Sequence, residues 1–233
     1  MKKWIAICLL ALTNMAFAKS ADSTTFQSVR AVHDVALETN PHSAFWQGAV
    51  PVYLEVDKWG KQIASDRTEV RSRWTKNNLY FLFICPYRKL NLKPNPHIKA
   101  ETNQLWNWDV AEVFIGSDFH NIRRYKEFEI SPQGEWVDLD INLDASNHDW
   151  GWNSGFQVAA RIDHKKKIWY GTMRIPISAI DPHAAQVGSM FRINLFRTAG
   201  ADPDTKMNVW QPTMSDTFHV PERFGLLKLV DSK

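Results

Sequence analysis

Two segments with a turn between them decide the fold: YKEFEIS (Tyr125–Ser131) and EWVDLDINL (Glu135–Leu143), joined by PQG (132–134). Apolar and polar residues alternate along the second segment, and one of its faces carries Val137, Leu139, Ile141 and Leu143. A repeat of two is the period of a β-strand that buries one face. Proline and glycine supply the backbone angles of a turn. The stretch therefore predicts a β-hairpin.

Segments of the same kind recur along the chain. Further strands are predicted at 70–74, 79–85, 109–115, 156–163, 168–175, 190–198 and 225–230. Short helical turns are expected only at 176–180 and near Ala184. Strands at this spacing without long helices favour an all-β fold, an antiparallel β-sandwich of jelly-roll or immunoglobulin-like two-sheet architecture. No repeat or change of composition marks a second domain, so we expect residues 28–233 to form one domain.

The N-terminus has the pattern of a signal peptide over residues 1–18. Lys2 and Lys3 are followed by an apolar run over 4–12 and by the small-x-small triplet AFA (16–18). The apolar run is shorter than the roughly 20 residues that span a bilayer. We expect a secreted or periplasmic protein with no membrane span after cleavage. Residues 19–27, rich in Ser, Thr and Asp, are expected to be a disordered lead-in.

Cysteine content and charge exclude several classes of protein. The chain has two cysteines, and Cys8 lies in the expected leader, so Cys85 has no internal partner. Cys85 ends the apolar run LYFLFIC (79–85), which predicts a buried thiol. The formal net charge is +3, and Lys2 and Lys3 supply two of these charges. No basic stripe is visible, so we expect no nucleic-acid partner.

Tryptophan is the unusual feature of the composition. The chain has eleven tryptophans, of which only Trp4 lies in the expected leader. Flat indole rings with a polar edge suit a surface that binds sugars. Trp46, Trp74 and Trp169 lie in or beside apolar strand patterns and are expected in the core.

Five further stretches follow one another in a characteristic order. They are Asp34–Ala49, which ends in FWQGA; RW (73–74) with LYF (79–81); WNWDVAEVFI (106–115); RIP (174–176); and FHVPERFG (218–225). Together they resemble the family 9 carbohydrate-binding modules and their free-standing relatives. The resemblance spans most of the chain, and it implies a β-sandwich of the kind shared by haem-binding and sugar-binding extracellular domains.

The resemblance also implies a shallow site in which two aromatic rings clamp a terminal sugar. Trp106 matches the first clamp tryptophan, and Glu112 matches the carboxylate that accepts hydrogen bonds from sugar hydroxyls. Trp210 is the candidate for the second clamp, with Asn208 as its polar neighbour. Because Trp210 lies in a proline-flanked segment (WQP, 210–212) outside any alternating pattern, we expect it at the surface.

One strand departs from the family pattern. Glu129 stands where the well-studied members of the family carry an arginine, which bears on the choice of sugar. Arg197, at the end of another predicted strand, could act as the donor instead. Trp108 is a further aromatic candidate beside Trp106.

Asp138 and Asp140 suggest a metal site. Two carboxylates at positions i and i+2 share a strand face, which suits Ca²⁺, and the family resemblance also implies structural calcium. A solvated polar face and a glycosidase acid–base pair are the other two interpretations.

Three classes of function therefore stay open. A non-catalytic, secreted carbohydrate-binding protein is favoured, with a glycan as ligand and a glycoside hydrolase as a partner. The second class is a periplasmic haem or redox accessory domain of the same fold. The third is a glycan-active hydrolase. Candidate haem ligands are His33, His97, His120, His148 and Met214, although no CxxCH motif is present.

Overall fold

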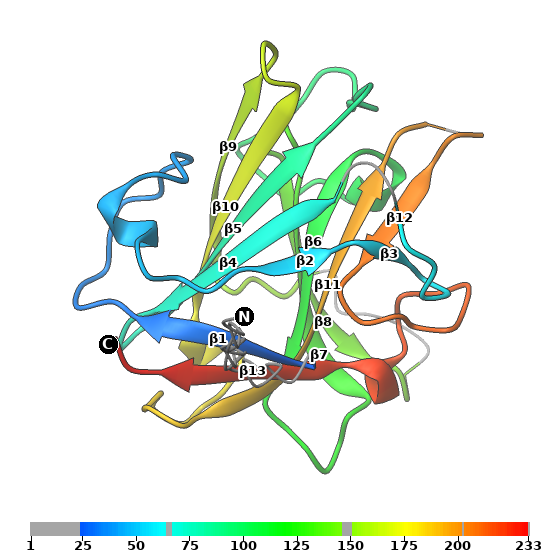
Figure 1. The fold of residues 1–233 in the computed structure, drawn as a ribbon. Helices are drawn as coiled ribbons and strands as arrows, with labels where there is room; N and C mark the ends of the chain where they lie inside the picture. The colour runs from blue at the N-terminus through cyan, green and yellow to red at the C-terminus, as the bar shows by residue number, and fades with distance from the viewer. Residues whose placement is uncertain (1–23, 64–66, 146–150, 202, 233) are drawn as a thin grey trace, which may run out of the picture.

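The computed structural model describes residues 24–63, 67–145, 151–201 and 203–232. Within these ranges the chain is all-β, with thirteen strands, four short 3₁₀ turns and no α-helix (Figure 1). The expected signal peptide and His148 lie outside the described residues. None of the helices in the described ranges has the length and apolar character to cross a membrane.

The strands fall close to the predicted positions. They are β1 Thr25–Arg30, β2 Val52–Leu54, β3 Val56–Asp57, β4 Thr68–Trp74, β5 Asn78–Pro86, β6 Val110–Gly116, β7 Arg124–Ile130, β8 Trp136–Asn142, β9 Gln157–Asp163, β10 Ile168–Pro176, β11 Met190–Ala199, β12 Lys206–Val209 and β13 Gly225–Val230. The 3₁₀ turns are η1 Ala44–Trp46, η2 Leu105–Asn107, η3 Ile177–Ala179 and η4 Pro221–Arg223. All nine predicted strands are present, and η3 is the helical turn expected at 176–180.

The strands pair into one continuous sheet that is nearly closed on itself. Their order is β8-β7-β6-β11-β13-β1-β4-β5-β10-β9. The prediction of two separate antiparallel sheets differs from this result, because β1 pairs in parallel with both β13 and β4 and joins the two halves. We call β8, β7, β6 and β11 the β6 half, and β4, β5, β10 and β9 the β5 half.

Four strands were not predicted. β2, β3 and β12 are only two to four residues long, too short to show an alternating pattern. β1 begins at Thr25, inside the stretch expected to be a disordered lead-in. Its residues Thr25–Val29 pair with β13, so the lead-in prediction is wrong for residues 25–27. Tertiary pairing, and not local hydrophobicity, makes this segment a strand.

The main core lies between the two halves. The β6 half contributes Ala111, Val113, Ile115, Phe128, Ile130, Ile193 and Leu195, and the β5 half contributes Val70, Phe81, Phe83, Cys85, Trp169, Met173 and Ile175. Because side chains alternate along a strand, the even-numbered residues of β6 point to the opposite face. We call this opposite face of the β6 half the pocket face.

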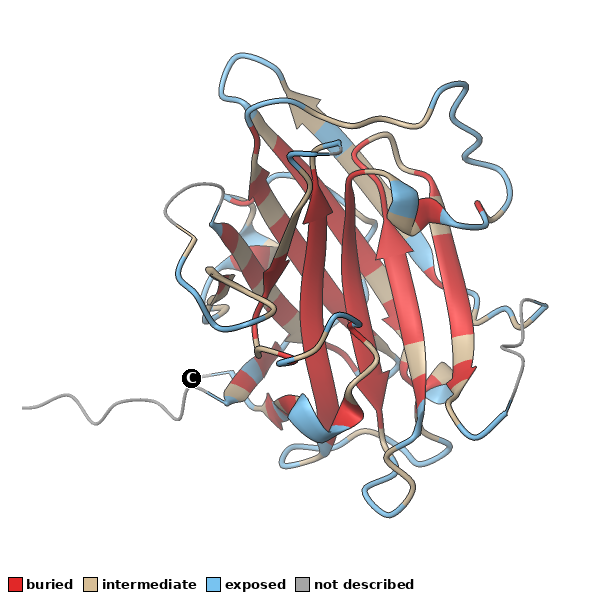
Figure 2. Ribbon diagram, turned by 90° about the vertical axis from the view of Figure 1, so that its right-hand side faces the viewer, coloured by how far each residue is buried: buried red, intermediate tan, exposed pale blue. Residues whose placement is uncertain are grey.

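The pocket face is buried as well. It carries a second apolar cluster that includes Val110, Phe114, Tyr125, Leu139 and Phe196. Every residue of β6 is buried. In Figure 2 the central strands are coloured as buried along almost their whole length, and most exposed residues lie in loops. Loops must therefore cover the pocket face and shape whatever opens on it.

The long connection between β5 and β6 is one of these loops. The Thr102 amide donates to the Trp136 carbonyl at 2.9 Å, and the Asp109 amide donates to the Asn91 carbonyl at 2.8 Å. The Glu101 carboxyl shares a hydrogen bond with Asp138 of β8. Burial, and after it the neighbouring Asp138, raise the pKa of Glu101 to about 7.

The buried thiol gives a first prediction. Cys85 is fully buried, and burial raises its pKa to about 12, so neither access nor ionisation favours reaction. We expect the protein that begins at Lys19 to react with a thiol reagent such as dithiobisnitrobenzoate only in denaturant, and to melt at the same temperature with and without a reductant. Rapid labelling of the folded protein would contradict the burial.

The Glu101–Asp138 contact gives a prediction about pH. A carboxyl with a raised pKa binds its proton more tightly in the folded state, so the free energy of unfolding should fall as pH rises from about 4.5 to about 7. Glu101→Gln should remove this loss. Allowing for partial exposure, we expect a gain of roughly 1 kcal/mol at pH 8, or about 2–4 °C in melting temperature.

Thermal melts at pH 4 and pH 8 measure this effect, with Glu38→Gln as the control because Glu38 is exposed. Equal melting temperatures for Glu101→Gln and the parent protein at pH 8 would show that the Glu101–Asp138 contact does not lower the free energy of unfolding.

Candidate functional site

A pocket of about 380 Å³ opens on the pocket face of the β6 half. Strands β6, β7, β8 and β11 form its floor, and η2 and the segment between β12 and η4 form its rim. Its lining residues are Trp106, Glu112, Phe114, Glu127, Leu139, Ile141, Thr198, Met207, Asp216, Thr217, Phe218 and His219. Aromatic and aliphatic walls around a few carboxylates make it an amphipathic site.

Trp106 and Glu112 lie together in this pocket. Trp106 lies in η2. The residue before this turn, Gln104, has a left-handed backbone conformation (φ 61°), and Leu105, the neighbour of Trp106, is fully buried. Trp106 is half-buried against the apolar cluster of the pocket face. Trp108 is partly exposed next to it but is not among the lining residues of this pocket.

Trp210 lies elsewhere, and the expectation of a surface position is wrong. It is only 8% exposed, belongs to the main core, and has its ring 6.1 Å from that of Phe26. A Cβ atom on Gly225 would come within 2.7 Å of this indole, so the glycine makes room for it. The cause is β12: Val209 faces the pocket side, so the next residue turns into the core.

Arg197 and Asn208 also lie on the core side. They pair across β11 and β12 and are both fully buried. The Arg197 guanidinium donates from Nη1 to Thr68 Oγ1 at 2.9 Å and from Nη2 to the Pro86 carbonyl at 2.7 Å. Thr198, one residue later in β11, is the residue that reaches the pocket. Neither Arg197 nor Asn208 lines the pocket that holds Glu112.

Two carboxylates, those of Glu112 and Glu127, line the pocket, and the fully buried carboxylate of Glu129 lies next to them without lining it. Glu112 of β6 pairs in register with Glu129 of β7, and Glu127 follows on the same face of β7. One oxygen from each lies within 4.8 Å of the others. Burial raises the pKa of Glu112 and of Glu129 well above their ordinary range, and the mutual repulsion of the carboxylates raises both further. Burial raises the pKa of Glu127 to about 7.

Sequence reasoning missed the second aromatic wall of the pocket. Phe218 stacks on Phe196 with ring centroids 4.2 Å apart and an interplanar angle of 14°. His219 stacks on Phe114 at 5.1 Å, and its Nδ1 lies 2.6 Å from the Tyr125 hydroxyl. Phe218 begins the closing family-like stretch (218–225), so the sequence contains a signal for this segment. The sequence does not show that Phe218 and Glu112 line the same pocket.

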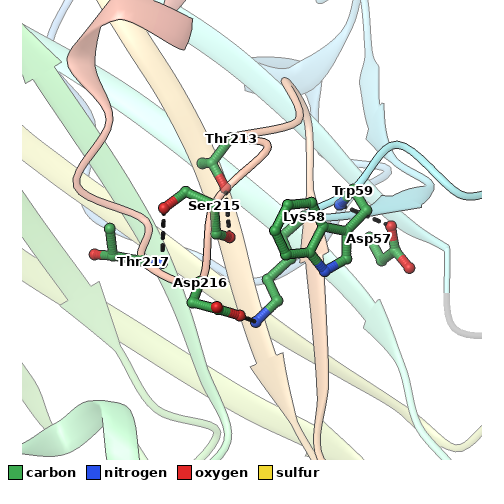
Figure 3. A network of polar contacts seen from close by, with 7 residues as sticks. All are labelled: Asp57, Lys58, Trp59, Thr213, Ser215, Asp216 and Thr217. Carbon is green, nitrogen blue, oxygen red and sulfur yellow. Dashed lines mark hydrogen bonds and ion pairs between the residues drawn. The ribbon is translucent and has the colours of Figure 1, made fainter.

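The rim is held by a network of polar contacts between two loops (Figure 3). Lys58 Nζ lies 2.7 Å from Asp216 Oδ1, and the Met214 amide donates to the Lys58 carbonyl at 2.8 Å. Within the rim, the Thr217 amide donates to Ser215 Oγ at 3.4 Å. These contacts fix the approach of the segment that carries Phe218 and His219.

Asp138 and Asp140 do not converge on a common point. Asp140 forms an ion pair with Lys126 at 2.6 Å, whereas Asp138 is buried and accepts from the Ser154 amide at 2.7 Å. They are not among the residues that group as metal ligands in the described part of the chain. Calcium at these two residues stays a prediction.

The described candidates for haem ligation are scattered. They are exposed on four separate loops: His33, His97, His120 and Met214. None of them lines the pocket.

One family model matches most of the chain. The family model described as "Carbohydrate family 9 binding domain-like" matches residues 41–232. A relative named "Extracellular protein" from Arthroderma benhamiae (strain ATCC MYA-4681 / CBS 112371) is 25% identical over 169 residues, which cover 66% of this chain and 70% of that protein.

Solved structures share the fold. A protein from Bacteroides uniformis ATCC 8492, to which carbohydrate binding has been ascribed, superposes with a TM-score of 0.71 at 15% identity, over 88% of this chain and 98% of its own. A family 9 carbohydrate-binding module from Caldicellulosiruptor kristjanssonii in complex with cellotriose gives a TM-score of 0.66 at 11% identity, over 90% and 95% of the two chains. At these identities the likeness shows the fold.

The match over most of the described chain, together with the shared fold, leads to one conclusion. This chain belongs to the carbohydrate family 9 binding domain-like family.

Proposed function

We propose that the protein is a secreted carbohydrate-binding protein that holds a glycan, or its terminal sugar, in the pocket of the β6 half. Trp106 forms one aromatic wall, and the segment Asp216–His219 forms the other. Glu112 and Glu127 accept hydrogen bonds from sugar hydroxyls. The protein binds and does not catalyse, and a glycoside hydrolase acting on the same glycan is its partner.

The observation that carries this proposal is the meeting of Trp106 and Glu112 in one pocket. A sugar offers apolar C–H faces and a ring of hydroxyl groups. Aromatic walls bury the faces, and carboxylates accept from the hydroxyls at roughly twice the strength of a neutral acceptor. The solved family 9 modules with the same fold are in complex with cellotriose and with glucose.

The second wall differs from the one that the family resemblance implied. Phe218 and His219 take the place proposed for Trp210, because they line the pocket and Trp210 does not. Both are held by stacking on Phe196 and Phe114, so the wall is rigid before a ligand arrives. Preorganisation of this kind lowers the entropic cost of binding.

The signal-like N-terminus and the relative named as extracellular support the proposed export. The alternatives, a haem domain and a glycan hydrolase, are separated by two measurements on the purified protein. A visible absorption spectrum tests haem, and release of reducing sugar from glycans tests hydrolysis. A glycan array tests the proposed binding directly, and an array without any bound glycan, with sugar release present, would favour the hydrolase.

Trp106 and Trp210 form a matched pair for a mutational test. A sugar face buries roughly 50–80 Å² on an indole, which is worth about 1–2 kcal/mol, so Trp106→Ala should weaken glycan binding roughly 5–30-fold. Its stability cost should stay near about 1 kcal/mol because the ring is half-buried. Trp210→Ala should instead lose roughly 3–5 kcal/mol of stability, as core truncations do.

Thermal melts and isothermal titration with the best array glycan measure both quantities, and Trp74→Ala serves as the core control because Trp74 is 2% exposed. If Trp106→Ala unfolds the protein as Trp74→Ala does, Trp106 is a structural residue. If it folds and binds the glycan unchanged, the pocket is not the binding site.

A further inference from the structure

The carboxylates of Glu112, Glu127 and Glu129 form a cluster, and in the described part of the chain the imidazole of His219 lies within ion-pair distance of it. They project from adjacent strands onto the pocket face, and each is at most 3% exposed. None of the residues that line the pocket is a lysine or an arginine.

The hydrogen-bond donors around the cluster are few. Thr198 Oγ1 is 3.5 Å from Glu112 Oε1, at the limit of a hydrogen bond, and His219 Nε2 is 4.0 Å from Glu127 Oε2. Both oxygens of Glu129 lack a donor among the described residues, although Glu129 is fully buried and its carboxylate points at the other two.

Apolar side chains flank the cluster on the strands. Phe114 on β6, Phe196 on β11, and Val137 and Leu139 on β8 surround the cluster on the pocket face. The nearest ammonium group on β7 belongs to Lys126, which lies on the other face and pairs with Asp140. An ionised carboxylate in such surroundings is costly unless a positive partner neutralises it.

Three convergent oxygens within 4.8 Å suit one hard cation. Divalent cations such as Ca²⁺ take six to eight oxygen ligands at roughly 2.3–2.6 Å, mostly from carboxylates, and leave their remaining positions to water. Carboxylate-only donors do not suit soft metals. The imidazole of His219, held by the Tyr125 hydroxyl at 2.6 Å, stands beside Glu127 and can orient it, as outer ligands of metal sites do.

We propose that Glu112, Glu127 and Glu129 bind a divalent cation, of which Ca²⁺ is the best candidate, at the floor of the pocket. Glu129 closes the site from behind, and Glu112 and Glu127 leave the pocket side of the cation open. If the proposed function is right, sugar hydroxyls complete the coordination sphere there, so sugar binding depends on the cation.

The first experiment uses the metal alone. The protein is stripped with chelator and melted with CaCl₂, MgCl₂ or MnCl₂, and Ca²⁺ binding is measured by isothermal titration. At a hundredfold excess over the dissociation constant, we expect a rise in melting temperature of roughly 5–10 °C. Glu129→Gln keeps the shape of the side chain and should lose at least tenfold in metal affinity.

Glu38→Gln is the matched control because Glu38 is exposed and lies outside the cluster, and it should bind Ca²⁺ as the parent does. Asp140→Asn tests the other predicted calcium site, which also lies outside the cluster. Loss of Ca²⁺ binding in Asp140→Asn with normal Ca²⁺ binding in Glu129→Gln would place the cation at Asp140 and overturn the proposal. Absence of any metal effect, with Glu129→Gln more stable than the parent, would show that the three carboxyls share protons instead.

A second measurement does not depend on the variants folding. Tb³⁺ takes the oxygen ligands of Ca²⁺ and emits when a nearby indole transfers its excitation, so the parent protein should show emission that Ca²⁺ displaces. Absence of displaceable emission would contradict the site.

Glycan titrations with Ca²⁺ and with chelator then separate the two proposals. Metal binding without any glycan binding would contradict only the proposed function. Glycan binding that chelator leaves unchanged, in a protein without a metal effect, would contradict only the cation site.

Discussion

The packing of the β6 half against the β5 half is the interaction on which the rest of the structure depends. It buries the odd-numbered residues of β6 with Phe128 and Leu195 against the aromatic side chains of β5 and β10. Because side chains alternate, this choice leaves Glu112, Glu127 and Glu129 on the opposite face together. A register shift of one residue would place these carboxylates in the core and Val113 in the pocket. The hydrophobic core therefore fixes the chemistry of the site without contributing an atom to it.

The pocket face combines two demands that conflict elsewhere in proteins. It is buried enough to hold an apolar cluster, in which the ring centroids of Phe114 and Phe196 lie 4.8 Å apart. The same face carries three carboxylates. Burial raises their pKa values, so the charges depend on a proton, a cation or a ligand for their partner. Binding to a site of this kind is strongest for a ligand that neutralises the carboxylates or forms hydrogen bonds with them. The carboxylates at the floor of the pocket therefore select which ligands bind there.

Loops complete the site because the strands alone would leave it open. The β5–β6 connection brings Trp106 over the floor, and backbone hydrogen bonds to Trp136 and Asn91 fix its path. The opposite rim is fixed by the Lys58–Asp216 contact and by stacking of Phe218 on Phe196. Both rims depend on residues far apart in sequence, so their positions follow from the closure of the sheet.

The sequence by itself determined the all-β class, the nine long strands and the buried thiol of Cys85. These follow from local signals, namely alternation and turn residues. The pairing of Trp106 with Glu112 was implied by the resemblance to the family and not by these local signals. Only the tertiary structure decided that β1 joins both halves in parallel, because no local pattern encodes a partner strand. It also placed Trp210 and Asn208 on the core side, since β12 is too short for its alternation to be visible in the sequence. Arg197 lies on the core side because it follows Ile193 and Leu195 on the same face of β11. In the sequence, Glu127 looks like an ordinary strand carboxylate, and Glu129 is notable only as a departure from the family pattern. The β6–β7 register brings both to Glu112, because contact across a sheet depends on register and not on sequence distance.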